Sequence, residues 1–151
     1  MRAAVALLLT IAGAPGMLAA DVCHATQPPV PAFTPPSPYS PAPFGDQTFL
    51  FGTDDLWVSL THQPWQGLRH KIFWWRPGFD GAQEHHPTLT LTIRPVNGSV
   101  TTSVERPATN AHFGGEWSML TMVDFPAAGC WEVRGSYGGH SVTFVASVVT
   151  P

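Results

Sequence analysis

Apolar and polar residues alternate most clearly near the end of the chain, within Asp124–Val149. Trp131 and Val133 share one face of a first run, and every second residue of Val142–Val148 shares one face of a second run. Successive side chains of a strand point to opposite faces, so this period of two predicts two strands that each bury one face. Gly138-Gly139 lies between the runs and can adopt the positive φ angles of a tight turn. The pattern therefore predicts a β-hairpin.

Shorter alternating runs precede this hairpin. They predict strands near residues 49–51, 56–60, 69–76, 88–94, 99–104 and 116–125, separated by loops that include 62–67, 79–87 and 107–115. Residues 69–76 are apolar on both faces, which is typical of a strand covered on both sides. About eight short strands at roughly ten-residue spacing, with no helical period, predict an all-β fold. The expected architecture is a two-sheet antiparallel sandwich with immunoglobulin-like topology and a Pro-rich extended N-terminal segment.

The first twenty residues have a different composition. Residues 1–20 combine one early positive charge with a continuous apolar run and end in small residues. This order is typical of a secretory signal peptide, and the run is too short to span a membrane. We expect cleavage after Ala20 or after Ala25 and export to the periplasm or the medium. A lipid anchor on Cys23 is not favoured, because Asp21-Val22 rather than small residues precede it.

Proline dominates the next segment, which we assign to residues 21–45. Half of the 16 prolines lie between Pro28 and Pro43. Proline lacks a backbone N–H and has a fixed φ, so this density excludes a helix or a central strand and favours extended polyproline geometry. The segment is predicted to be either a spacer or a strap laid across the folded domain, which is expected to comprise residues 46–151.

Cys23 and Cys130 are the two cysteines of the chain. In an exported protein the oxidising compartment favours a disulfide between them, and two unpaired thiols are the alternative. If Trp131 and Val133 face the core, Cys130 faces away from it. The bridge would then run over the outer surface of its sheet, and the Pro-rich segment would cover outward apolar groups such as Val145, Phe73 and Trp75.

Charge and motif content exclude several classes of function. Ten acidic and seven basic residues give a formal net charge of −3, which offers no basic surface for nucleic acid. The chain contains no Gly-x-Ser-x-Gly motif, no spacing typical of a catalytic triad, and no carboxylate pair that could be assigned to glycoside hydrolysis. We therefore expect a protein that is not an enzyme and uses no cofactor.

Histidines provide one candidate site. The chain has seven, of which His85 and His86 adjoin Glu84 in a predicted loop. Imidazole and carboxylate groups suit zinc or copper, so these three residues are candidate ligands of a periplasmic metal-binding protein. However, adjacent residues of an extended chain point in opposite directions, and no His-x-His spacing occurs. Solvent-exposed loop histidines are the alternative interpretation.

Tryptophans provide a second candidate. Six tryptophans are many for a small sandwich, and those that point outward need an explanation. Trp57, Trp65 and Trp75 could form an exposed surface on which sugar rings or a partner protein pack. Alternatively, they pack beneath loops and the Pro-rich segment. Coplanar exposed rings along a groove would favour the first interpretation.

Three sequence blocks occur in a distinctive order, namely Gly52–Trp57 (GTDDLW), Lys71–Gly78 (KIFWWRPG) and Phe125–Val133 (FPAAGCWEV). Together they resemble a group of uncharacterised small exported bacterial proteins and lipoproteins, whose mature chains begin near a cysteine and continue through a Pro-rich segment. The resemblance implies bacterial export and a β-sandwich. It implies no activity.

The sequence thus leads to one expectation and two alternatives. We expect an exported, non-catalytic module of the cell envelope with a binding or structural role, whose partner is a protein or a glycan. The first alternative is a carbohydrate-binding module that uses exposed tryptophans. The second is a periplasmic protein that binds metal through the histidine loop.

Overall fold

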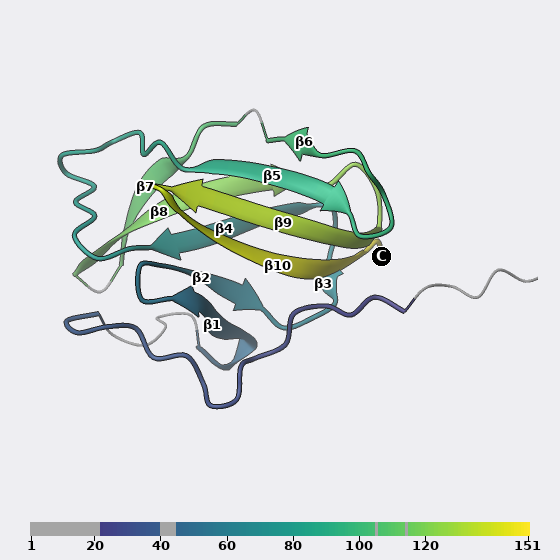
Figure 1. The fold of residues 1–151 in the computed structure, drawn as a ribbon, viewed down its shortest axis with the longest axis horizontal. Coiled ribbons are helices and arrows are strands. Elements are labelled where there is room, and N and C mark those ends of the chain that lie inside the picture. The colour runs from purple at the N-terminus through teal and green to yellow at the C-terminus, as the bar shows by residue number, and fades with distance from the viewer. Residues whose placement is uncertain (1–21, 40–44, 105, 114) are drawn as a thin grey trace, which may run out of the picture.

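A computed structural model describes residues 22–39, 45–104, 106–113 and 115–151 of the chain. This part is all-β apart from the 3₁₀ turn Gly45–Gln47, and its strands form two five-stranded sheets that pack face to face (Figure 1). The predicted two-sheet sandwich is confirmed, whereas the immunoglobulin-like topology stays a prediction. No helix in the described ranges is long and apolar enough to cross a membrane. The predicted signal peptide lies outside the described residues.

The first sheet, which we call sheet A, is antiparallel throughout. Its strand order is β1 (Thr48–Thr53), β2 (Leu56–Thr61), β4 (Arg69–Trp75), β8 (Glu116–Asp124) and β7 (Thr109–Phe113). Strand β7 lies in a segment expected to be a loop. Its own residues do not alternate clearly, and the strand forms because β8 supplies the backbone partners over its whole length.

The second sheet, sheet B, contains the predicted C-terminal hairpin. Its order is β3 (Trp65–Gln66), β10 (His140–Val149), β9 (Gly129–Tyr137), β5 (Thr90–Pro95) and β6 (Thr102–Ser103). All pairs are antiparallel except β3 with β10, which is parallel and was expected as loop. Gly138 and Gly139 have φ of 56° and 83°, which are the positive angles that a two-residue turn of this type requires.

The core lies between the two sheets and consists of the residues that alternation predicts to face inward. Sheet A contributes Leu56, Val58 and Leu60 from β2, Ile72 and Trp74 from β4, and Met119 and Val123 from β8. Sheet B contributes Leu91, Ile93, Trp131, Val133, Val142, Phe144, Ala146 and Val148. Burial of these apolar side chains is the main favourable term in folding.

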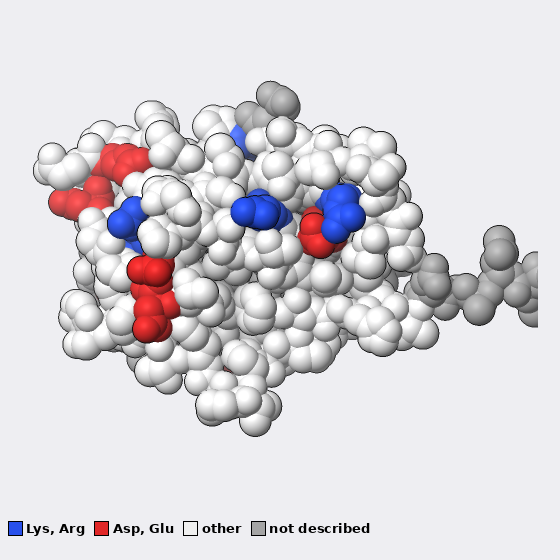
Figure 2. Space-filling model, viewed as in Figure 1, with Lys and Arg blue, Asp and Glu red and all other residues white. Residues whose placement is uncertain are grey.

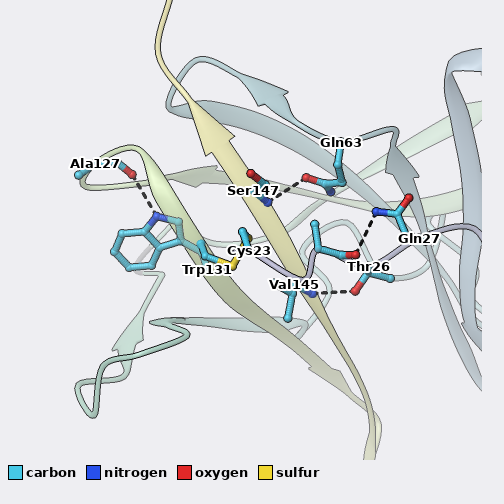
Figure 3. The surroundings of a disulfide bond; sticks show 10 residues. Cys23, Thr26, Gln27, Gln63, Ala127, Trp131, Val145 and Ser147 are labelled. Carbon is cyan, nitrogen blue, oxygen red and sulfur yellow. Dashed lines mark hydrogen bonds between the residues drawn. A yellow bond between two sulfur atoms is a disulfide. The ribbon is translucent and has the colours of Figure 1, made fainter. Parts of the chain in front are cut away.

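The described part of the Pro-rich segment, residues 22–39, is an extended strap bound to the sandwich, and we call it the N-terminal strap. It begins at the predicted disulfide between Cys23 and Cys130, which the structure confirms. Thr26 then pairs with the free edge of β10, since its N–H donates to the carbonyl of Val145 at 2.9 Å and its Oγ1 accepts from the Val145 N–H at 2.8 Å. Figure 3 shows both anchors side by side. The spacer interpretation is therefore wrong for these residues.

Beyond this edge the strap crosses the outer face of sheet A (Figure 1). Phe33 and Tyr39 pack against a second apolar cluster that consists of Leu50, Trp57 and Trp75. The Tyr39 ring meets the Trp57 ring edge to face, with the centroids 5.1 Å apart. The strap thus buries the outward apolar residues Leu50, Trp57 and Trp75 of sheet A. Cys130 belongs to β9 of sheet B, so its outward orientation predicted only where the strap begins.

Candidate functional site

The three tryptophans proposed as an exposed ligand surface are buried. The exposed fraction of the residue is 1% for Trp57, 3% for Trp65 and 4% for Trp75. Trp57 and Trp75 lie beneath the strap on sheet A, whereas Trp65 belongs to the core between the sheets. The interpretation as an exposed surface is therefore wrong, and the alternative, packing beneath the Pro-rich segment, holds for Trp57 and Trp75. A carbohydrate surface built on these rings is excluded by their burial.

The histidine loop does not gather metal ligands. His85 and His86 are exposed, whereas the Glu84 carboxylate accepts hydrogen bonds from the backbone N–H of Thr88 at 3.1 Å and from the hydroxyl of Tyr137. Within the described ranges, no three His, Cys, Asp or Glu side chains converge closely enough to hold a metal ion. The three candidate residues are thus not brought together as a site, and Glu84 has a different partner.

That partner is part of a polar contact at one end of the sandwich. The Tyr137 hydroxyl donates to Glu84, and the Arg76 guanidinium carbon lies 5.4 Å from the Tyr137 ring centroid. Burial, together with the hydrogen bond and the negative charge of Glu84, raises the pKa of Tyr137 to about 12. The phenol therefore stays protonated at neutral pH. Its role in the structure is to join the loop after β4 to the β9–β10 hairpin.

The outer faces of the two sheets differ sharply. The strap covers the outward apolar residues Leu50, Trp57 and Trp75 of sheet A. On the outside of sheet B, Thr90, Arg134, Ser141 and Thr143 are exposed and the other outward residues of β5, β9 and β10 are partly buried. Outward residues of these three strands form rows, because the strands are in register. The rows are Thr90, Ser136 and Ser141, then Thr92, Arg134 and Thr143, then Arg94, Glu132 and Val145. We call these nine residues the open face.

Hydroxyl groups predominate on the open face, and charges are few. Figure 2 views the molecule from this side and shows isolated charged groups on a largely uncharged surface. Arg94 and Glu132 neutralise each other, with Nη2 of the arginine 2.8 Å from Oε2 of the glutamate. Arg134 instead donates from Nη2 to the Ser141 hydroxyl at 2.9 Å. Such a surface can form many directional hydrogen bonds but buries little apolar area on binding.

Alternation along the sequence predicts each of these orientations strand by strand. It places Thr90, Thr92 and Arg94 outward on one strand and Glu132 and Arg134 outward on another. The open face was nevertheless missed as a site, because only the register between strands shows which hydroxyls lie beside Arg134. The available signal was a row of Thr and Ser at outward positions of neighbouring strands.

Comparison with known proteins does not assign the chain to a family. The chain matches no protein-family model, and neither a curated protein nor a solved structure shows significant similarity to it.

Proposed function

We propose that this protein is an exported, non-catalytic binding module of the cell envelope and that its open face contacts the ligand. The observation that carries this proposal is the difference between the two outer faces. Apolar side chains on the outside of sheet A are covered by the strap, whereas sheet B exposes the hydroxyl-bearing residues Thr90, Ser141 and Thr143 on β5 and β10. An exposed array of hydrogen-bonding groups suits a polar partner such as a glycan or a polar protein surface.

Two observations support the envelope location. The first is the order of charged, apolar and small residues at the start of the sequence, which is typical of a secretory signal. The second is the Cys23–Cys130 disulfide, which is compatible with an oxidising exported compartment. The strap also pairs with the edge of β10 at Val145 through Thr26, and a covered strand edge suits a protein exposed to other chains.

A sedimentation assay with isolated envelope tests the proposal. The tagged full-length chain, processed in its host, is mixed with the envelope fraction, and the bound share is measured. Thr143 and Thr109 are both exposed strand threonines, on sheet B and on the edge of sheet A respectively. We expect Thr143→Glu to abolish retention and Thr109→Glu to leave it unchanged. Equal retention of the two variants would refute the assignment of the open face.

A further inference from the structure

A cavity of about 230 Å³ hollows the open face beside the β9–β10 turn. Its lining includes the hydroxyl-bearing residues Thr88, Ser136 and Ser141 and the guanidinium of Arg134. The register places Ser136 directly opposite Ser141 and sets Arg134 two residues away on the same face. None of the residues that line this cavity is acidic.

Arg134 differs from three other arginines in its surroundings. Arg69 and Arg106 are within salt-bridge distance of Asp124, and Arg94 pairs with Glu132. In the described part of the chain, Arg134 has no carboxylate within 4.0 Å and donates to a neutral hydroxyl instead.

The nearest acidic side chains are already engaged. Glu132 lies two residues before Arg134 on the same face, but both of its carboxylate oxygens accept hydrogen bonds from Arg94. Glu84 binds Tyr137, and Asp55 lies 3.5 Å from the His140 ring on the rim of the cavity. Among the described residues, no carboxylate therefore neutralises the exposed guanidinium of Arg134.

We propose that this cavity binds an oxyanion, namely the carboxylate, phosphate or sulfate group of an envelope glycan. A guanidinium presents a planar fork of donors that matches the two oxygens of such a group. The hydroxyls of Ser136, Ser141 and Thr88 can donate to the remaining oxygens or to sugar hydroxyls. This inference rests on the proposed function and specifies the ligand class of the open face.

The size of the cavity favours an anion attached to a larger molecule. One water needs about 10–15 Å³ of such a volume, so about 230 Å³ is more than one compact ion needs. A second cavity of about 350 Å³ also has Thr88 in its lining, together with Ser103 and Pro107. A polymer bound through its anionic group in the first cavity could therefore reach the second across Thr88.

NMR titration of the folded full-length chain tests the inference. The probes are sodium sulfate, sodium phosphate, trigalacturonic acid and a neutral trisaccharide, each at constant ionic strength. We expect saturable amide shifts at Ser136, Ser141 and the Gly138-Gly139 turn with trigalacturonic acid and none with the neutral sugar. The inorganic anions should produce the same pattern at higher concentration. If none of the anions produces a saturable shift, the inference is overturned.

Variants that remove the same charge at two positions distinguish a specific anion site from non-specific electrostatic attraction. Arg134→Gln should weaken binding of trigalacturonic acid at least about tenfold, since it removes the charge-assisted hydrogen bonds. Arg134→Lys should retain part of the affinity. Lys71→Gln removes the same charge from an exposed position on sheet A and should change nothing. Equal weakening by Arg134→Gln and Lys71→Gln would show non-specific attraction and refute the site.

The remaining outcomes distinguish this inference from the proposed function. If Arg134→Gln remains bound to envelope as strongly as the unaltered chain while Thr143→Glu does not, the open face stands and the anion inference fails. If trigalacturonic acid binds but envelope retention is absent, the site stands and the proposed function fails. Equal affinity for phosphate and trigalacturonic acid would assign the cavity to a free anion and overturn the glycan part.

Discussion

The indole ring of Trp74 in sheet A lies directly against the backbone of Gly135 in sheet B. A Cβ atom placed on Gly135 would lie 2.3 Å from Cη2 of that ring, which is far inside van der Waals contact. The ring is held in position because its Nε1 donates to the Thr121 hydroxyl at 2.9 Å. The spacing of the two sheets at this point therefore depends on the absence of a side chain at position 135.

Substitution of this glycine should destabilise the fold. We expect Gly135→Ala to lower the free energy of unfolding by about 1–3 kcal/mol or more, because the added methyl overpacks a rigid part of the core. Ser136→Ala, the next residue on the same strand, serves as the control and should change stability by less than about 0.5 kcal/mol. Urea denaturation measures both. Equal stability of the two variants would contradict close packing of Trp74 against Gly135.

Removal of the disulfide should cause a larger loss. The bridge joins residues 107 apart in sequence, and in the chain-entropy model a loop of this length corresponds to about 4 to 5 kcal/mol. The double variant Cys23→Ser, Cys130→Ser should lose stability of this order, and reduction of the unaltered chain should give the same value. A loss below about 1 kcal/mol would show that the strap is held mainly by its other contacts.

Tyr39 anchors the far end of the strap, and two substitutions separate its contacts. Its hydroxyl donates to the Arg76 carbonyl at 3.1 Å and accepts from the Gly78 N–H at 2.9 Å. Tyr39→Phe keeps the ring and should lower stability by about 1–2 kcal/mol without altering tryptophan fluorescence. Tyr39→Ala also uncovers Trp57 and should shift the emission to longer wavelength. Identical emission spectra of the two variants would refute the proposal that the Tyr39 ring shields Trp57 from solvent.

The raised pKa of Tyr137 predicts a loss of stability in alkali. Its pKa is about 12 in the folded chain, against about 10 for an unperturbed tyrosine. The folded state therefore holds this proton between pH 10 and 12 while the unfolded state releases it, so the contribution is present below pH 10 and falls as pH rises through that range.

Tyrosinate absorbance as a function of pH measures this titration. Tyr137→Phe identifies the signal, since Tyr39 is the other tyrosine of the chain. Burial contributes most to the shift, and Glu84 adds a hydrogen bond and a charge. We therefore expect Glu84→Gln to lower the pKa of Tyr137 while leaving it above the ordinary value. An unchanged pKa of Tyr137 in Glu84→Gln would contradict the hydrogen bond between Tyr137 and Glu84.

Much of the fold follows from alternation alone. The period of two places Leu56, Val58 and Leu60 inward, and the structure buries all three. The same rule turns Cys130 outward and so predicts on which side of the sheets the strap begins. These predictions succeed because the orientation of a side chain in a strand depends only on local backbone geometry.

The features that the sequence analysis missed depend on partners distant in sequence. Strand β7 forms because β8 pairs with it, and the sequence of Thr109–Phe113 contains no pattern that predicts this pairing. Trp57 was predicted to point outward, and its burial beneath the Pro-rich segment was one of two interpretations. The path of the strap decides between them, and proline content alone does not give that path. Likewise, the neighbours of Arg134 depend on the register of β9 with β10.

The link from Cys23 to Cys130 also constrains the sequence of events during biosynthesis. A ribosome releases the first cysteine more than a hundred residues before its partner, so the Cys23 end of the strap has no docking place until the final hairpin is complete. With two cysteines in the whole chain, scrambled pairings within one molecule do not exist. A nascent chain can still form an incorrect disulfide with another molecule. The period in which it can do so lasts from the appearance of Cys23 until Cys130 is in place.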